Sequence, residues 1–279
     1  MYRIIHSQMI APNIHQLEIE APNIAGSVQA GQFVILRVED NGERIPLTIS
    51  DWDVEKGSIT VIAILVGHTT QKLATLRAGE MIPTVAGPLG NPLEMDNFGT
   101  VVCLGGCYGI GSLYAVERAL KQHGNRVITF IEGRSSYLFY WEEKLKKYCD
   151  KIIFVTRDGT KGYRGHVDQL TGILAQLGEP VNRVVINGCN LLLKKGSDAT
   201  RELNIPTQVA LNTIMIDGTG MCGVCRVSID GQMKFACVDG PYFNGHQVDW
   251  DELFKRRQTY MDEELKSLRS SKGQGSFCQ

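Results

Sequence analysis

Apolar and polar residues follow a strand-like pattern through the first hundred positions of the chain. In residues 15–20 the two kinds of side chain alternate, which is typical of a strand with one buried face. Turn dipeptides such as Asn41-Gly42 and Lys56-Gly57 separate this segment from further strand-like runs. Strands are predicted at residues 15–20, 32–38, 45–49 and 58–66, with one short helix at 70–76. Short strands at this spacing predict a small antiparallel β-barrel.

From Gly99 onward the pattern changes to continuous apolar runs, each followed by a helix-like segment. Buried strands are predicted at residues 100–104, 126–131, 151–155 and 183–186, and helices at 112–123, 141–148 and 167–177. Because continuous apolar strands that alternate with helices are typical of a parallel sheet covered on both faces, this part is predicted to be a doubly wound α/β domain.

The composition shifts again near residue 217, where glycine and cysteine become frequent and Asp230-Gly231 predicts a hairpin turn. Residues 250–269 predict one more helix, with a mobile tail at 270–279. One face of this predicted helix carries apolar residues, which are expected to pack either on the rest of the chain or on a partner. These residues are Phe254, Met261, Leu265 and Leu268. The predicted division is a barrel at 1–98, an α/β domain at 99–213, a cysteine module at 214–250, and a helix with tail at 251–279.

The charge balance and the length of the apolar runs indicate which kinds of partner and location to expect for this chain. The 279 residues include 29 Lys and Arg against 30 Asp and Glu, and 43% of them are hydrophobic. A formal net charge of −1 predicts no nucleic-acid partner. No apolar run approaches the roughly 20 residues that cross a bilayer, and the first residues lack the apolar core of a secretory signal. The chain is therefore expected in the cytoplasm.

The most specific pattern joins an aspartate and three cysteines as D-x4-C-x2-C-x11-C, formed by Asp217, Cys222, Cys225 and Cys237. Plant-type [2Fe–2S] sites use a related spacing, in which a loop wraps around the cluster. We therefore predict a [2Fe–2S] cluster with these four residues as ligands. Two alternatives remain: a zinc site that uses the three cysteines with Asp217 or His246, and reduced cysteines without metal.

A glycine-rich turn follows the first strand of the α/β domain and leads into a helix. Such a turn lets backbone N–H groups approach a pyrophosphate, although it can also simply tighten a strand–helix connection. Glu132 ends the next strand and could accept hydrogen bonds from a ribose 2′-hydroxyl, which favours NAD(H) over NADP(H). Arg134 and Arg157 could instead hold a 2′-phosphate, or be surface charges. The candidate glycines are Gly105, Gly106, Gly109 and Gly111.

This order of barrel, nucleotide domain and cysteine motif resembles the ferredoxin–NADP reductase superfamily. Residues 216–227 and 234–241 resemble more closely the electron-transfer subunit of dihydroorotate dehydrogenase and the small (alpha) subunit of NADH-dependent reduced-ferredoxin:NADP oxidoreductase, which is sulfide dehydrogenase-like. The dihydroorotate relatives have cysteine where this chain has Asp217, so the second group is the nearer match. The resemblance covers nearly the whole chain.

The resemblance implies FAD in the barrel, NAD(H) in the α/β domain and the [2Fe–2S] cluster in the module at 214–250. Pro46, Leu47 and Thr48 would lie along the flavin ring, with Arg44 as a phosphate partner. The start of a short helix would bind the pyrophosphate. The further residues expected to bind FAD or the nucleotide are Ile49, Val66, Gly67, Thr69, Thr70 and Gly188.

The implied function is an oxidoreductase subunit that passes electrons between NAD(H), FAD and the cluster. The partner would be a larger subunit with FAD and [4Fe–4S] clusters, with ferredoxin reached indirectly. The family analogy extends to electron bifurcation by the whole complex. No side chain is expected to act as a catalytic acid or base, because the cofactors carry the chemistry. Cys107 and Cys189 stand where the family has glycine and proline. One alternative is therefore a relay and docking subunit without NAD(H), and another is the dihydroorotate dehydrogenase subunit itself.

Overall fold

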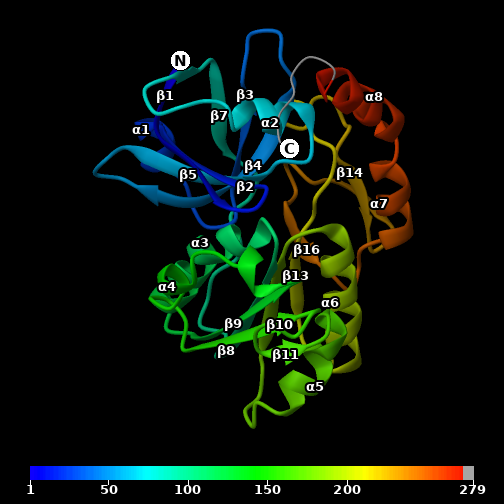
Figure 1. Cartoon of the computed structure of the whole chain (residues 1–279). Helices are drawn as coiled ribbons and strands as arrows, with labels where there is room; N and C mark the ends of the chain where they lie inside the picture. The colour runs from blue at the N-terminus through cyan, green and yellow to red at the C-terminus, as the bar shows by residue number, and fades with distance from the viewer. Residues whose placement is uncertain (273–279) are drawn as a thin grey trace.

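The computed structural model describes residues 1–272 of the chain. Figure 1 shows two layers of β-structure, one above the other, with the C-terminal helices running along one side of both. The upper layer is formed by the N-terminal part of the chain and the lower layer by the middle part. Among the described residues, no helix is long and apolar enough to cross a membrane.

The upper layer is a seven-stranded sheet in which each strand pairs antiparallel with its neighbours, as predicted. Leu17, Val34 and Val61 are fully buried in its interior, because alternate residues of the strands face inward. The first strand was missed in the sequence, where its polar residues hide the alternation. The strand order is β6 (Met81–Ile82), β1 (Tyr2–Ala11), β2 (Ile14–Glu20), β5 (Ser58–Ile64), β4 (Arg44–Asp53), β3 (Phe33–Arg37) and β7 (Thr84–Leu89), with helices α1 (Pro22–Ala25) and α2 (His68–Leu73) between strands.

The lower layer is a second seven-stranded sheet. Six of its strands are parallel, and the chain winds outward from β8 in both directions, which confirms the predicted doubly wound α/β fold. The seventh strand comes from the predicted cysteine module and pairs antiparallel with β13. The order is β11 (Tyr163–Arg164), β10 (Lys151–Thr156), β9 (Arg126–Gly133), β8 (Thr100–Gly106), β12 (Arg183–Asn187), β13 (Thr207–Ala210) and β16 (Tyr242–Asn244).

Strand β8 shows why this sheet needs helices on both faces. Its residues Val101 and Cys103 pack in one apolar cluster with α3 (Gly109–Gln122) and α4 (Glu142–Leu145). Val102 and Leu104 point the other way, into a cluster with α5 (Leu170–Ala175) and α6 (Asn190–Glu202). All four are fully buried, so each face must be covered. Helix α6 was missing from the sequence-based prediction, and two short 3₁₀ turns, η1 (Ser136–Leu138) and η2 (Val167–Gln169), precede α4 and α5.

The predicted hairpin is present as β14 (Arg226–Ile229) and β15 (Gln232–Phe235). Asp230 and Gly231 at its turn both have positive φ, which an Asp-Gly pair tolerates well. Apart from this hairpin and β16, residues 214–249 are irregular, and α7 (Trp250–Arg257) packs against β14. The boundaries of the four predicted parts stay a prediction.

The prediction of one continuous helix over residues 250–269 was wrong. The chain turns between α7 and α8 (Met261–Lys272), where Thr259 N donates to the Arg256 carbonyl at 3.2 Å. The Thr259 hydroxyl also donates to that carbonyl, at 2.7 Å, and such local bonds compete with helix continuation. The predicted apolar stripe is therefore divided, with Phe254 packed on the core and Leu265 44% exposed. Residues 273–279 of the predicted tail lie outside the described residues.

The two layers are fastened together by a cluster of charged and aromatic side chains. Asp51 of β4 accepts hydrogen bonds from Arg118 of α3 at 2.7 Å and from Lys144 of α4 at 2.6 Å. The two cations also lie over aromatic rings, Arg118 over Trp52 and Lys144 over Trp141. Helix α3 packs directly on β4 and β5. These contacts fix the barrel relative to the α/β sheet, and with it the cavity between them.

Candidate functional site

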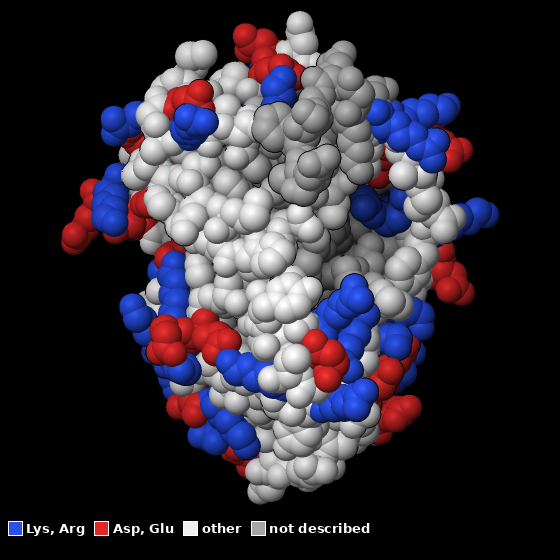
Figure 2. All heavy atoms as spheres, viewed as in Figure 1, with Lys and Arg blue, Asp and Glu red and all other residues white. Residues whose placement is uncertain are grey.

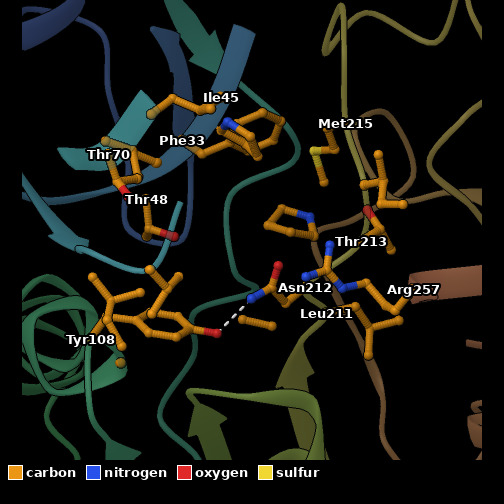
Figure 3. A pocket seen from close by; sticks show the side chains of 18 of the residues that line it. Phe33, Ile45, Thr48, Thr70, Tyr108, Leu211, Asn212, Thr213, Met215 and Arg257 are labelled. Carbon is orange, nitrogen blue, oxygen red and sulfur yellow. Dashed lines mark hydrogen bonds between the residues drawn. The ribbon is translucent and has the colours of Figure 1, made fainter. Parts of the chain in front are cut away.

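A cavity of about 670 Å³ lies between the barrel, the edge of the parallel sheet and the C-terminal helices. Figure 3 shows side chains from all these regions pointing into it. Its lining is largely apolar, which suits a planar aromatic ligand. Half of the predicted cofactor-binding residues line it: Arg44, Pro46, Leu47, Thr48, Val66, Thr70, Gly109 and Gly188.

Strand β4 forms the barrel wall of the cavity. Arg44, Pro46 and Thr48 are two positions apart, so their side chains share one face of the strand. The intervening Ile45 and Leu47 pack on the barrel core and still reach the cavity lining. Ile49 continues that inward face and is 1% exposed. It does not line the cavity, so the strand places it as a core residue and not as a ligand-binding one.

The predicted pyrophosphate site at the start of α2 is only partly open to the cavity. Thr70 lines it, and the Thr70 hydroxyl closes the first turn by accepting from Gly67 N at 3.1 Å. Gly67 itself does not line the cavity. Thr69 is buried, and its hydroxyl donates to the Glu43 carboxylate. The helix start can therefore offer Thr70, whereas the Thr69 hydroxyl is already occupied.

Glycines in the turn after β8 serve two purposes, cavity lining and close packing, which the sequence alone did not distinguish. Gly109 lines the cavity, and a Cβ there would lie 2.2 Å from the Asn187 carbonyl oxygen. Gly105 and Gly111 lie behind the loop, where a Cβ would meet Leu113 and Ile62, each at 2.6 Å. Gly106 packs similarly against Leu192 of α6. Close packing accounts for glycine at positions 105, 106 and 111, and their contact with a pyrophosphate stays a prediction.

Two tyrosines hold this loop in place, and sequence reasoning missed both. The buried Tyr140 hydroxyl accepts from Gly111 N at 3.0 Å and lies 3.0 Å from the Cys107 carbonyl oxygen, to which it can donate. Tyr108 lies within the loop and donates to the Gly188 carbonyl at 2.9 Å. Burial raises the pKa of each hydroxyl, so both stay protonated as donors. The position of Tyr108 directly inside a glycine-rich loop was the sequence signal that could have identified it.

Asn212 lies beside Tyr108 and Gly188 in the cavity lining, and these three residues form what we call the floor of the cavity. Its side-chain amide donates to the Tyr108 hydroxyl at 2.5 Å, as Figure 3 shows. Asn190 at the start of α6 donates to the Asn212 carbonyl at 2.8 Å. These bonds connect the glycine loop, the end of β12 and the segment that leads to the cysteines. The hydrogen bonds of Tyr108, Asn190 and Asn212 thus hold the floor of the cavity together.

The predicted ribose-binding residues lie at the carboxyl edge of the sheet but outside the cavity lining. Glu132 is 5% exposed and already accepts from Arg157 Nε at 3.2 Å. His166 Nε2 lies 2.8 Å from the same guanidinium. Burial lowers the pKa of His166, so the neutral ring can accept from Arg157. Arg134 is exposed, and only its carbonyl is engaged, by Asp158 N at 3.2 Å.

The four predicted cluster ligands lie in one irregular loop. Cys225 and Cys237 are both 2% exposed, and their sulfurs are 3.2 Å apart. The Asp217 carboxylate accepts from Thr219 N at 3.0 Å and from Cys222 N at 2.9 Å. These hydrogen bonds hold the pKa of Asp217 below its usual range, so it is ionised at neutral pH. Cys222 is exposed.

The donor set of this loop suits an iron–sulfur cluster. Gly218 and Gly220 have positive φ, and a Cβ at Gly220 would lie 2.6 Å from Val238, so the loop needs glycine to curl. Within residues 1–272, no three His, Cys, Asp or Glu side chains converge as they stand to hold a metal ion. His246 bonds to Thr200 at 3.0 Å, which engages the ring proposed for zinc.

A barrel joined to a doubly wound sheet, with a shared cavity that ends beside a cysteine loop, defines a reductase-type fold with an attached metal domain. Residues 212–249 match the family described as the iron-sulfur cluster binding domain of dihydroorotate dehydrogenase B. This match confirms the predicted iron–sulfur domain, whereas the individual ligands stay a prediction. A ferredoxin NADP+ reductase from Neisseria gonorrhoeae shares the fold, with a TM-score of 0.56 over 72% of this chain and 89% of that chain at 14% identity.

Full-length relatives narrow the assignment further. The chain is 40% identical over 262 residues to the dihydroorotate dehydrogenase B electron transfer subunit homolog of Thermotoga maritima, covering 94% of this chain and 92% of the relative. It is 28% identical over 258 residues to the electron transfer subunit of Enterococcus faecalis, covering 89% and 97%. The chain therefore belongs to the family of dihydroorotate dehydrogenase B-type electron transfer subunits.

A solved structure agrees with this family over nearly the whole chain. It describes flavin-based electron bifurcation in the NADH-dependent reduced ferredoxin-NADP oxidoreductase, with a TM-score of 0.92 and 38% identity over 97% of both chains. The predicted superfamily, fold class and electron-transfer function are thus confirmed, and the fold is one that holds FAD, a nicotinamide nucleotide and an iron–sulfur cluster.

Proposed function

We propose that this chain uses NAD(H) as the two-electron partner of a bound FAD and exchanges single electrons through its cluster. The observation that carries this proposal is the shared lining of the cavity. Thr48 comes from the barrel, Gly188 from the nucleotide edge, and Ile216 stands one residue before Asp217. A ligand in this cavity would thus contact the parts of the chain assigned to all three cofactors.

The chain's own residues bind, orient and exclude water. When bound, FAD and the cluster supply the redox chemistry, because a flavin can accept two electrons together and give them up singly. The apolar faces of Ile45, Leu47 and Met215 exclude water from the cavity interior. The polar floor formed by Tyr108 and Asn212 orients what lies on it. No acid or base is assigned to the reaction.

We propose NAD(H) and not NADP(H) from the charge balance at the nucleotide edge. Arg157 is matched by Glu132 and Lys195 by Asp168, so these two cations are each neutralised by a carboxylate. A 2′-phosphate needs excess positive charge, and neither of these two pairs supplies it. Arg134 is exposed and is the remaining cation that could hold a 2′-phosphate.

The partner is proposed from the relatives. Several are named as electron transfer subunits of dihydroorotate dehydrogenase B, and one solved structure concerns electron bifurcation with reduced ferredoxin. We propose a heteromeric complex with a larger subunit that carries FAD and [4Fe–4S] clusters and reaches ferredoxin. Asp217 in place of a cysteine favours this partner over a dihydroorotate-oxidising one.

A second candidate is a relay subunit that does not bind NAD(H). It is favoured by the engaged Glu132 carboxylate and by Cys107, which has φ 54° at the loop where a pyrophosphate would lie. Its side chain stands where the family has glycine. In this reading FAD and the cluster are bound, but electrons enter only from the partner.

Anaerobic titration of the purified chain with NADH distinguishes the two. Flavin bleaching near one equivalent of NADH supports the proposed oxidoreductase, whereas bleaching only by dithionite supports the relay. Iron, acid-labile sulfide and flavin are measured in the same preparation. A colourless protein with zinc and without iron would contradict both.

A further inference from the structure

Two arginines line the cavity, Arg44 and Arg257, and only Arg44 was predicted to bind a cofactor phosphate. Arg44 belongs to the barrel wall, as described above, and Arg257 is the last residue of α7. Figure 3 shows Arg257 extending from the C-terminal helix toward Asn212, at the side of the cavity away from Thr70. In the described part of the chain, Arg257 has neither an ion pair nor a hydrogen bond to its side chain.

The surroundings of Arg257 differ from those of an exposed cation on the same helix. Its side chain is half-buried, whereas Lys255 on the same helix is exposed. Burial raises the pKa of Tyr108, and the nearby positive charge of Arg257 opposes that rise, which places the guanidinium close to the cavity floor. Glu263 and Glu264 also line the cavity, from α8, but neither pairs with Arg257. A half-buried guanidinium that faces the cavity without a counterion is available to bind a negatively charged ligand.

The neighbouring residue connects the same helix to the cysteine loop. Arg256 Nη2 donates to the Val224 carbonyl at 3.1 Å, and Val224 lies between Cys222 and Cys225. Successive residues on a helix point about 100° apart, so Arg256 and Arg257 reach different surfaces from one turn. Helix α7 therefore contacts the cluster loop with one arginine and the cavity with the next.

We propose that Arg257 binds a negatively charged group of the dinucleotide held in the cavity. This inference rests on the proposed function and adds a residue of the C-terminal helix to the cofactor site. The anion is either a group of FAD or a phosphate of the nicotinamide nucleotide beside it, since both are dinucleotides. Guanidinium forks bind such oxygens with two hydrogen bonds. Through α7, the occupied cavity is then tied to the cysteine loop.

The test compares single variants of the full-length holoprotein. Arg257→Gln removes the charge, Arg257→Lys keeps the charge without the fork, and Lys255→Gln removes an exposed charge from the same helix. FAD release is followed after dilution by the rise of flavin fluorescence. Binding of NAD+ is followed by the perturbation of flavin absorbance. Loss of a charge-assisted hydrogen bond is expected to change the affected constant about 10- to 100-fold in Arg257→Gln.

If FAD is the source of the anion, Arg257→Gln releases FAD faster and Arg257→Lys is intermediate. If the nicotinamide nucleotide is the source, FAD release is unchanged and NAD+ binding weakens. Lys255→Gln should match the wild type in both measurements. The proposal is overturned if Arg257→Gln matches Lys255→Gln in both, or if Arg256→Gln weakens FAD as much as Arg257→Gln, because the effect would then belong to the helix as a whole.

A wild-type protein that binds no flavin would instead contradict the proposed function, so the two failures are distinguishable. Should Arg257→Gln not fold, the intermediate result expected for Arg257→Lys decides: wild-type FAD release and NAD+ binding in that folded variant would also overturn the proposal. Arg256→Gln carries its own expectation. It should retain FAD at the wild-type rate but lose iron to a chelator several-fold faster.

Discussion

The glycine loop and the cysteine loop are both irregular turns beside one cavity, yet they are held in different ways. The glycine loop joins β8 to α3, and the Tyr140 hydroxyl bonds to its backbone at two points. The cysteine loop is held mainly by the Asp217 carboxylate and by the contact between two buried sulfurs. Its third cysteine, Cys222, is exposed.

This difference indicates which of the two loops depends on a bound ligand for its ordered shape. The glycine loop is part of a continuous buried core, so its shape is stabilised by packing whether or not a nucleotide is bound. In the cysteine loop, the predicted cluster needs three thiols and a carboxylate to converge, and metal binding supplies much of the energy for such an arrangement. We therefore expect the glycine loop to stay ordered in the apoprotein and the cysteine loop to become ordered with its cluster.

The largest effect is expected from removing a buried sulfur. Cys225→Ala and Cys237→Ala should each abolish cluster binding, because the remaining donors cannot complete the coordination of both irons. FAD should be retained, since neither cysteine lines the cavity. Iron and acid-labile sulfide per flavin provide the measurement. Cys149→Ala, at a half-buried cysteine outside the loop, is the control. A full complement of iron in both loop variants would contradict this reading of the loop.

Asp217 is expected to give a smaller but more specific effect. As a ligand, its oxygen is a harder donor than sulfur, so Asp217→Cys should keep a [2Fe–2S] cluster with altered EPR spectra and potential. Asp217→Ala should bind the cluster weakly or not at all. The alternative role is visible in the structure, where the carboxylate accepts two backbone N–H groups. Wild-type spectra and potential in both variants would leave it only that structural role.

Removing one hydroxyl tests the stability of the glycine loop. Tyr140→Phe leaves Gly111 N and the Cys107 carbonyl without their buried partner. A buried group left unsatisfied costs about 1–3 kcal/mol of unfolding free energy. Urea unfolding measures the loss, and Tyr137→Phe at a 64% exposed position is the matched control. Equal stability of the two variants would mean that the loop does not depend on this hydroxyl.

The smallest expected effect is on the pH dependence of stability, and it arises from α3, the helix that follows the glycine loop. Glu117 of α3 is fully buried, its Oε1 accepts from the Thr129 hydroxyl at 2.6 Å, and its Oε2 has no partner. Burial raises the pKa of Glu117 well above its usual range, so the folded protein keeps this carboxyl protonated. The unfolded chain releases the proton near pH 4.3, a roughly ordinary value for glutamate.

Stability should therefore fall as the pH rises from about 4.3 toward the raised pKa, because the unfolded state binds fewer protons over that range. Glu117→Gln stays neutral and should remove this part of the pH dependence. Its unfolding free energy should exceed that of the wild type at pH 8 and approach it at pH 4. The comparison is made by urea unfolding at several pH values. Parallel pH profiles for the two proteins would show that Glu117 is ionised in the fold.

The class of each part of the chain could be predicted from local sequence patterns alone. Alternating residues in one half and continuous apolar runs in the other distinguish a sheet with one buried face from a sheet buried on both. The spacing of Asp217, Cys222, Cys225 and Cys237 indicated the iron–sulfur domain, because local spacing is enough to specify a loop. The same local pattern could not find β1 or α6, whose apolar faces are defined only by the layers they pack against.

Which residues meet in the cavity depends on the packing of the elements and could not be predicted from those patterns. Ile49, Gly105 and Gly111 fit sequence motifs, yet packing on neighbouring elements places them behind the cavity wall. Tyr108 stands inside the glycine motif without a predicted role, and Arg257 belongs to no recognised motif. They reach the cavity from elements about 150 residues apart in sequence. Side-chain convergence depends on how the barrel, sheet and helices pack. A linear pattern records the local period of each element but not the distance between elements.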